Sequence, residues 1–287
     1  MTRKTYITVG IVGLLTTNLL SAVMAQPYHW IQHFSSVMPP PASGPSMVYD
    51  QARQVSVLFG GAAGDGFTTF GDTWGWDGTT WTLLQPADPQ GSTAPKPRAS
   101  HAMVYDDNRA VIVLFAGAGV GGHFTDTWEW DGSSWKMVHP GGAGAPPARD
   151  QHAMAYDSFR QRTVLFGGGT GGGPGLGDTW EWDGNQWLQR SSVGPVARSM
   201  HSMAYDPVRQ TSVLFGGTTG SQILGDTWEW DGTAWNERQV TGPSNRRGAP
   251  MAFDTVRQTI VLFGGNDIPG GNFGTMFNDT WDWNGTT

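Results

Sequence analysis

The sequence predicts an all-β protein, a β-propeller of five four-stranded blades. The prediction rests on a unit that recurs five times, on the length of the repeat, and on alternating side chains within each unit. The units open with MVYD, MVYD, MAYD, MAYD and MAFD at Met47, Met103, Met154, Met203 and Met251. The aromatic residues of these tetrapeptides are 56, 51, 49 and 48 positions apart, a period that suits a four-stranded blade and exceeds that of helical solenoid units.

The first two segments of each unit predict an inner pair of strands. In HSMAYD the side chains alternate, so that His201, Met203 and Tyr205 share one face. The run SVLFGG that follows the next turn is short, apolar and rich in β-branched residues, and it ends at a glycine pair. Such a run is typical of a strand buried on both faces.

The last two segments predict the outer pair of strands. DTWEWDG places Trp228 and Trp230 on one face and Glu229 on the other. Its Asp-Gly step predicts a two-residue hairpin turn with positive φ at both central residues. The fourth strand follows and begins at Trp235. No segment shows sustained helical periodicity, which favours an all-β fold.

These motifs resemble kelch repeats. A glycine pair follows the second strand, and two tryptophans with six residues between them follow in turn. The glycine pairs are Gly60-Gly61, Gly167-Gly168, Gly216-Gly217 and Gly264-Gly265, with Ala116-Gly117 in the second repeat; the tryptophans include Trp74 and Trp81, Trp128 and Trp135, Trp180 and Trp187, and Trp228 and Trp235. The resemblance is to secreted bacterial members and to the central propeller of the galactose oxidase type. It implies repeats near 42–84, 98–138, 149–190, 198–238 and 246–287, and it implies a fold without a particular function.

Residues 1–25 have the features of a signal peptide. Arg3 and Lys4 precede an apolar run from Tyr6 to Leu20, and small residues lead up to Ala25. The run is too short and too interrupted to favour a membrane span, so an uncleaved anchor is the lesser alternative. We expect cleavage after Ala25, bacterial export to a secreted or periplasmic location, and a mature propeller of residues 26–287.

Trp30 stands ahead of the first repeat and suggests how the propeller closes. Ten tryptophans fall on third strands and four begin fourth strands, and the fifth repeat stops at WDWNGTT before its own fourth-strand tryptophan. We therefore expect residues 29–34 to be the outer strand of the last blade, so that the N-terminal strand closes the ring. The alternative is a fragment with further blades beyond Thr287, or a structural module of a larger protein.

The charge and the lack of cysteine exclude several functions. Without Arg3 and Lys4 the chain keeps 15 of 17 basic residues against 24 acidic ones, a formal charge of −9. Nucleic acids and anionic membranes need basic surfaces, so neither is an expected partner. Zero cysteines rule out disulfides and the tyrosine–cysteine copper site that the galactose oxidase resemblance would imply. We expect a monomer with no cofactor.

The connections between strands 2 and 3 vary in sequence and emerge on one face, where binding is expected. Near that face three repeats carry Arg-x-x-His. The candidate ligand-binding residues are Arg98, His101, Arg149, Asp150, His152, Arg198, His201 and Arg246. They could form a ring of donors around the channel mouth; alternatively, each arginine pairs with a carboxylate and each histidine bonds a backbone group. A three-histidine metal site is not expected, because packed sheets lie about 10 Å apart and metal bonds measure about 2 Å.

The acidic residues argue against catalysis. Of 24, 18 occupy repeated positions, which leaves Asp65, Asp88, Asp107, Asp150, Asp267 and Glu237. A glycosidase needs two carboxylates about 5–10 Å apart, and Asp150 has no evident partner in the sequence. We expect a secreted, non-catalytic propeller that recognises a glycan or an extracellular protein through its variable-loop face. The alternative is a hydrolase or sugar-modifying enzyme with its site at the channel mouth.

Overall fold

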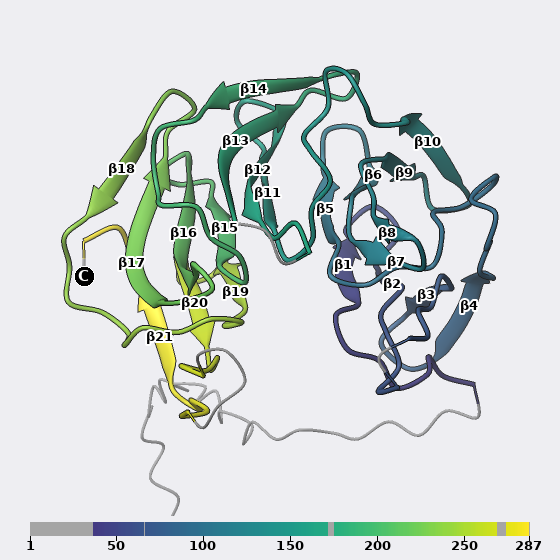
Figure 1. Ribbon diagram of the computed structural model, residues 1–287, viewed down its shortest axis with the longest axis horizontal. Coiled ribbons are helices and arrows are strands. Elements are labelled where there is room, and N and C mark those ends of the chain that lie inside the picture. Colours follow the sequence, from purple (N-terminus) through teal and green to yellow (C-terminus); the bar gives the residue numbers. More distant parts are fainter. Residues whose placement is uncertain (1–36, 66, 172–174, 269–273, 287) are drawn as a thin grey trace, which may run out of the picture. The chain divides into compact units, whose positions relative to one another are not determined.

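The computed structural model describes residues 37–286 except 66, 172–174 and 269–273. Within this part every regular element is a β-strand, and the strands form successive antiparallel sheets that follow one another in chain order (Figure 1). The predicted all-β propeller of antiparallel blades is confirmed. The expected closing strand, residues 29–34, lies outside the described residues.

Four blades contain four strands each, in meander order from the innermost to the outermost. They are β1 (Ser46–Asp50), β2 (Val55–Phe59), β3 (Thr73–Trp76) and β4 (Trp81–Gln85); β5 (Ala102–Asp106), β6 (Val111–Phe115), β9 (Thr127–Trp130) and β10 (Trp135–His139); β11 (Ala153–Asp157), β12 (Arg162–Gly168), β13 (Leu176–Trp182) and β14 (Trp187–Ser191); and β15 (Ser202–Asp206), β16 (Thr211–Thr218), β17 (Ile223–Trp230) and β18 (Trp235–Arg238). The second blade also carries a small hairpin, β7 (Ala118–Gly119) and β8 (Gly122–His123).

The fifth blade has three described strands, β19 (Met251–Asp254), β20 (Thr259–Phe263) and β21 (Thr280–Trp283), in the order β19-β20-β21. Its strands pair as in the other blades, with Met251 opposite Leu262 and Leu262 opposite Trp281. The outer edge of β21 therefore has no neighbouring strand among the described residues.

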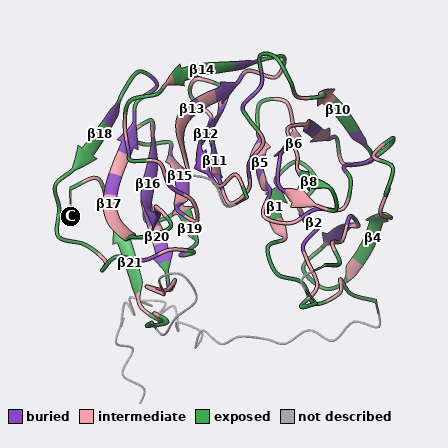
Figure 2. Cartoon of the chain, viewed as in Figure 1, coloured by how far each residue is buried: buried purple, intermediate pink, exposed green. Residues whose placement is uncertain are grey.

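The core lies between blades, and the inner strands of the second, third and fourth blades are largely buried on both faces. Val57 and Phe59 of the first blade pack in one cluster with Ile112, Leu114 and Trp130 of the second. The same arrangement recurs at the next two junctions. Figure 2 shows the consequence: buried residues follow the inner strands, while the outer strands β4, β10, β14 and β18 are largely exposed.

The glycine pair is required because it approaches the next blade closely. The amide of Gly217 donates a hydrogen bond to the carbonyl oxygen of Arg246 over 2.9 Å. A Cβ on Gly216 would lie 2.5 Å from that same oxygen, and Gly216 has φ +64°. The second blade has Ala116 at this position, with φ +55°, so its backbone keeps the left-handed conformation that glycine adopts at less cost.

A chain of backbone hydrogen bonds links the starts of the innermost strands. The residue before each histidine position has positive φ in all five repeats. The amide of each such residue donates to the carbonyl of its counterpart in the preceding blade: Ser100 to Gly44 (2.8 Å), Gln151 to Ser100 (2.9 Å), Met200 to Gln151 (2.9 Å) and Gly248 to Met200 (2.8 Å). These bonds and the packing of β1 on β5, β5 on β11, β11 on β15 and β15 on β19 set the blade order.

The Asp-Gly turns differ from the predicted two-residue hairpins. Four residues, 77–80, separate β3 from β4, and only Gly78 has positive φ. The side chain of Asp77 accepts hydrogen bonds from the amides of Thr79 and Thr80, both over 2.8 Å. The aspartate therefore caps a longer turn instead of entering the left-handed region itself.

Candidate functional site

The four repeated arginines lie inside the blades. Arg98, Arg149, Arg198 and Arg246 are 0–1 % exposed. Each forms a two-pronged ion pair with the aspartate of the DTW motif in its own blade; Nη1 and Nη2 of Arg98 lie 2.6 and 2.8 Å from the two carboxylate oxygens of Asp126. Nη1 of Arg98 also donates to the carbonyl of Ala116. Burial opposes ionisation of Asp126, but the guanidinium of Arg98 outweighs it and holds the pKa of Asp126 below its usual value.

The three repeated histidines are also buried, each against a phenylalanine of the preceding blade. The ring centroids of His101 and Phe59 are 5.4 Å apart in an edge-on arrangement, and His201 and Phe166 are 5.5 Å apart. Burial, reinforced by the neighbouring arginine, lowers the pKa of His101 and of His201 from 6.5 to about 3. The pKa of His152 is lowered well below 6.5 for the same reasons. Because their pKa values are lowered, the three imidazole rings are uncharged near neutral pH, and each packs between two blades.

The structure buries seven of the eight candidate residues, namely Arg98, Arg149, Arg198, Arg246, His101, His152 and His201. The ring of donors at the channel mouth stays a prediction. The contacts of the four arginines match its alternative, in which each arginine pairs with a carboxylate. The physical reason is that each arginine side chain forms its hydrogen bonds within its own blade. It binds the carboxylate at strand 3 and a backbone carbonyl at the end of strand 2. Of the eight candidate residues, Asp150 alone lines a described pocket.

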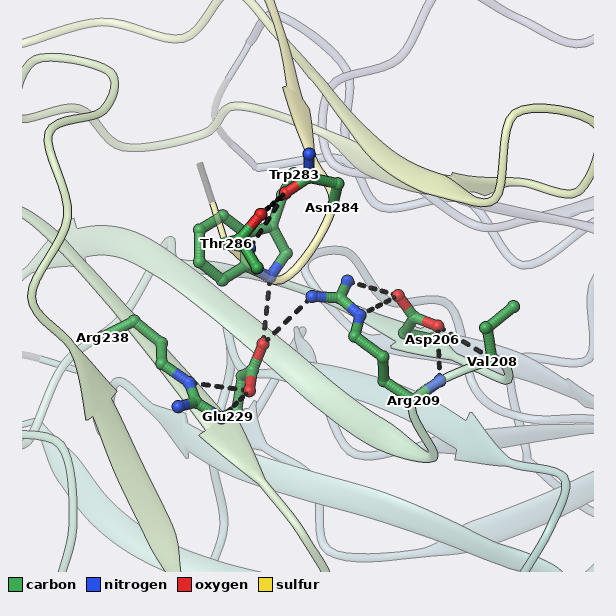
Figure 3. A network of polar contacts seen from close by, with 8 residues as sticks. All are labelled: Asp206, Val208, Arg209, Glu229, Arg238, Trp283, Asn284 and Thr286. Carbon is green, nitrogen blue, oxygen red and sulfur yellow. Dashed lines mark hydrogen bonds and ion pairs between the residues drawn. The ribbon is translucent and has the colours of Figure 1, made fainter.

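The acidic residues that recur in the repeat also pair with arginines. The Asp-x-x-Arg turns contain ion pairs, as in Asp206 with Arg209. Figure 3 shows how Glu229 joins this pair to the next blade: its carboxylate accepts from Nε of Arg238 over 2.8 Å and from the indole N–H of Trp283 over 3.0 Å, with Nη1 of Arg209 at 3.4 Å. The glutamate between the paired tryptophans thus holds two blades together.

A polar pocket of about 220 Å³ contains Asp150. Its lining also includes Gln151, Thr170, Ser199, Thr218 and Thr219, together with glycines of the strand 2–3 loops. His123, at the end of the hairpin β7–β8, places Nε2 3.5 Å from Oδ2 of Asp150. Burial raises the pKa of Asp150 against the influence of His123. The pocket therefore offers a carboxylate and several hydroxyl groups to a polar ligand, and the imidazole of His123 contacts that carboxylate.

An apolar groove of about 510 Å³ lies on the same loop face, between the first and second blades. Its lining comprises Phe67, Thr68, Thr69, Pro89, Lys96, Pro97, Val120 and Phe124. Phe67 is 85 % exposed and Val120 82 % exposed. We call this surface the loop groove.

Side-chain contacts support the loops beside the loop groove. Asp65 accepts hydrogen bonds from the amides of Phe67 and Thr68, both over 2.9 Å, and the bonds to Thr68 lower the pKa of Asp65 to about 2. On the other side, the guanidinium carbon of Arg98 lies 4.0 Å from the ring centroid of Phe124. The amide of Phe67 is bonded to Asp65, and Val120 lies in the turn between β7 and β8, so contacts within each loop support the two highly exposed side chains.

Sequence reasoning missed His123 and the residues of the loop groove. Their signal is present in the sequence, because Phe67, Val120 and His123 interrupt glycine-rich loops and have no counterpart in the other repeats. Which of these loop residues lie together depends on how closely the loops of adjacent blades approach each other. The repeat pattern does not specify the distance between those loops.

In the described part of the chain, no cluster of three or more histidine, cysteine or acidic residues is arranged to hold a metal ion. No helix in that part is long and apolar enough to cross a membrane.

The sheet order, the glycine pairs and the interblade tryptophans define a kelch-repeat β-propeller, a class that typically acts as a scaffold for binding other proteins. Residues 131–287 match the family model described as the KLHDC2/KLHL20/DRC7 Kelch-repeats domain. The match covers more than half of the chain, and the chain belongs to this family. A search of curated proteins finds no match.

Proposed function

We propose that the protein binds a segment of an extracellular protein through the loop groove after export from the cell. The observation that carries this proposal is the pair Phe67 and Val120, each more than four-fifths exposed and each lining the loop groove. Apolar groups this exposed on a soluble surface are typical of interaction sites. Lys96 is an exposed cation in the lining and favours a partner with a carboxylate next to its apolar side chains.

An array of random dodecapeptides tests this function. We expect the mature protein to retain peptides that combine aromatic or aliphatic residues with an acidic one. The double substitution Phe67→Ser and Val120→Ser should weaken binding at least tenfold, because the loss of exposed apolar anchors removes the main binding energy. Phe159→Ser is the matched control: Phe159 is 66 % exposed but belongs to a short turn on the opposite face, so binding should persist.

A parallel glycan array distinguishes glycan recognition from peptide binding. Retention of glycans with no retained peptide, unaffected by the double substitution, would overturn the protein-binding proposal. Equal losses from the Phe159 control and the double variant would overturn the assignment to the loop groove.

A hydrolytic function is the second candidate, and the contact between His123 and Asp150 favours it. A half-buried carboxylate with a raised pKa beside an imidazole is a pair that proton-transfer catalysis can use. Against it, Asp150 is the sole acidic residue in the described lining of the polar pocket, so two-carboxylate glycoside hydrolysis is not supported there. Asp150→Asn and His123→Ala should leave peptide binding unchanged; a measured turnover that both substitutions abolish would establish the enzyme instead.

A further inference from the structure

A pocket of about 110 Å³ lies in the first blade, between the segment that precedes β1 and the strands β2 and β3. Its lining includes Pro40, Ala42, Gly60, Phe70, Asp72 and Trp74. Ala42 is exposed, so the pocket borders the surface of the protein. We call it the Asp72 pocket.

The Asp72 pocket begins at the position that an arginine occupies in the other four repeats. The residue after this position pairs with a residue at or just beyond the end of strand 2 in every blade: Ser43 with Ala62, Ala99 with Ala118, Asp150 with Gly169, Ser199 with Thr218 and Arg247 with Asn266. Ala42 is therefore the counterpart of the buried arginines. Its Cβ also has a similar place, because a Cβ built on Gly61 would lie 2.7 Å from it, and the equivalent distance to the Cβ of Arg149 in the third blade is 3.3 Å.

The groups that bind these arginines have counterparts in the lining of the Asp72 pocket. Nε of Arg98 donates to the carbonyl two residues earlier, and Nη1 donates to the carbonyl at the end of strand 2. Nη1 and Nη2 both donate to the carboxylate of the DTW motif. The other three arginines make the same contacts. The corresponding residues of the first blade are Pro40, Gly60 and Asp72, and all three line the pocket.

Phe70 adds the aromatic face on which a guanidinium packs elsewhere in the protein. In the second and fifth blades the guanidinium carbon lies 4.0 and 4.1 Å from a ring centroid, in the pairs Arg98 with Phe124 and Arg246 with Phe277. Each of these phenylalanines stands two residues before the aspartate of its DTW motif, as Phe70 stands two residues before Asp72. A cation over an aromatic face is attracted by the quadrupole of the ring, so the pocket combines both partners of an arginine site.

The indole and the carboxylate of the first blade differ from their counterparts. In the other four blades the tryptophan of the DTW motif donates its indole N–H to the aspartate of the motif over 2.6–2.8 Å. Trp74 is 8 % exposed, and its Nε1 is buried without a hydrogen-bond partner among the described residues. Asp72 instead accepts a hydrogen bond from the amide of Ala87 over 2.9 Å. A buried donor without an acceptor costs free energy, which a ligand that reorients the Asp72 carboxylate can recover.

We propose that the Asp72 pocket binds a guanidinium group of another molecule, either a small guanidino compound or an arginine side chain of a partner. A guanidinium presents five N–H donors in one plane, which matches a carboxylate, two carbonyl oxygens and an aromatic face. An ammonium group is a point charge and does not form the same two-pronged contact. About 10–15 Å³ of such space holds one water, so the pocket has room for the four heavy atoms of a guanidinium. It shares no lining residue with the loop groove, and the proposal does not rest on peptide binding there.

Titration of the full chain with methylguanidinium chloride in a calorimeter tests the site. We expect saturable binding. Methylammonium, which has the same charge, and urea, which is planar but uncharged, should each bind roughly tenfold more weakly or worse. Equal affinities for methylguanidinium and methylammonium, or no saturable binding of methylguanidinium, would overturn the proposal.

Two aspartate variants locate the bound cation. Asp72→Asn should weaken methylguanidinium binding by roughly tenfold or more, because it removes the charge and one prong of the contact. Asp107→Asn is the matched control: Asp107 is an exposed acid on a strand 1–2 turn, so its loss lowers the negative charge equally and should leave the affinity unchanged. Equal losses for the two variants would overturn the assignment to the Asp72 pocket.

Ala42→Arg supplies the guanidinium from the chain itself. It should raise the Tm by several degrees and abolish methylguanidinium binding, because its own side chain then fills the pocket as in the other four blades. Ala42→Gln, similar in length but uncharged, is the control and should raise the Tm by less than about half as much. Equal Tm values for the two variants, or full retention of methylguanidinium binding by Ala42→Arg, would overturn the proposal.

The source of the guanidinium is distinguished by comparing free L-arginine with a blocked Ala-Arg-Ala tripeptide. Tighter binding of the tripeptide supports the site with a partner protein as its occupant, and tighter binding of the free amino acid supports it with a small guanidino compound. A blocked Ala-Lys-Ala tripeptide is the control and should bind more weakly than its arginine counterpart. Equal binding of the arginine and lysine tripeptides, or no binding of either arginine ligand, would overturn the proposal.

Discussion

At the scale of single residues, the buried arginine of each repeat explains why the motif recurs. Arg198 is fully buried, its guanidinium forms a two-pronged pair with Asp226, and its backbone carbonyl accepts the amide of Gly168 in the preceding blade. One residue therefore fixes strand 1 to strand 3 within a blade and fixes that blade to its neighbour. Arg198, a candidate ligand-binding residue in the sequence, thus links two strands and two blades in the fold.

Replacing Arg198 by alanine should lower the free energy of unfolding by about 3–5 kcal/mol, because the Asp226 carboxylate loses its partner in a mostly buried site. Urea unfolding followed by tryptophan fluorescence measures the change. Arg257→Ala is the control: the side chain of Arg257 is 68 % exposed and pairs with Asp254 across a turn, so its effect should stay below about 1 kcal/mol. Similar losses of unfolding free energy for the Arg198 and Arg257 variants would contradict this structural role of Arg198.

The buried histidines predict a dependence of stability on pH. In the unfolded chain a histidine gains a proton below its ordinary pKa of 6.5, whereas in the folded protein the pKa of His201 is about 3. Between these values the unfolded state binds the extra proton, so the free energy of unfolding falls as the pH falls. The slope is about 1.4 kcal/mol per pH unit for each such histidine.

His201→Gln should flatten this slope by about one third between pH 6 and 4.5, since three histidines share the environment. Urea unfolding at a series of pH values measures it. The window lies above the range in which the lowered pKa values of Asp126 and Asp226 act. An unchanged slope in the variant would show that His201 is protonated in the folded protein.

At the scale of the structural element, the end of strand 2 decides how closely blades approach. The first glycine of the pair has positive φ and faces the arginine carbonyl of the next blade. Ala116 shows that a methyl group fits this position in the second blade, at φ +55°. The departure of the second repeat from the glycine pair is therefore tolerated at some cost in backbone strain.

Gly216→Ala and Ala116→Gly form a matched pair of substitutions. We expect Gly216→Ala to destabilise the fold by about 1–2 kcal/mol or more, because the new Cβ lies 2.5 Å from the Arg246 carbonyl oxygen and φ is left-handed. Ala116→Gly should change stability by less than about 1 kcal/mol, because strain relief offsets the lost methyl group. Chemical denaturation compares the two; equal destabilisation would contradict this account.

At the scale of the whole molecule, stability comes from contacts between neighbouring blades. Each junction repeats one cluster of phenylalanine, tryptophan and methionine. In such an array each unit stabilises its immediate neighbours. The two end faces, marked by Met47 and Phe263, lack this cover among the described residues.

Phe115→Ala should lower the free energy of unfolding by about 3–5 kcal/mol. The Phe115 ring is fully buried, and its centroid lies 4.9 Å from that of Trp187 and 5.6 Å from that of His152, both in the next blade. Phe159→Ala, on an exposed turn, should change stability by no more than about 0.5 kcal/mol. Thermal unfolding measures the stability of both variants. A small effect at Phe115 would mean that the blades are stable without their junctions.

The sequence alone determined the class of fold, the strand order in a blade and the motifs that the repeated strands carry, because period-two alternation and a recurring motif are local properties of the chain. It also identified the arginine, histidine and aspartate positions as special without showing that most of them face inward. Only the tertiary structure decided this, since the burial of Arg98 or His101 depends on a second blade packed against the first. For the same reason, the contact of His123 with Asp150 and the position of Phe67 and Val120 along one groove follow from the approach of neighbouring loops in space, which no single repeat encodes.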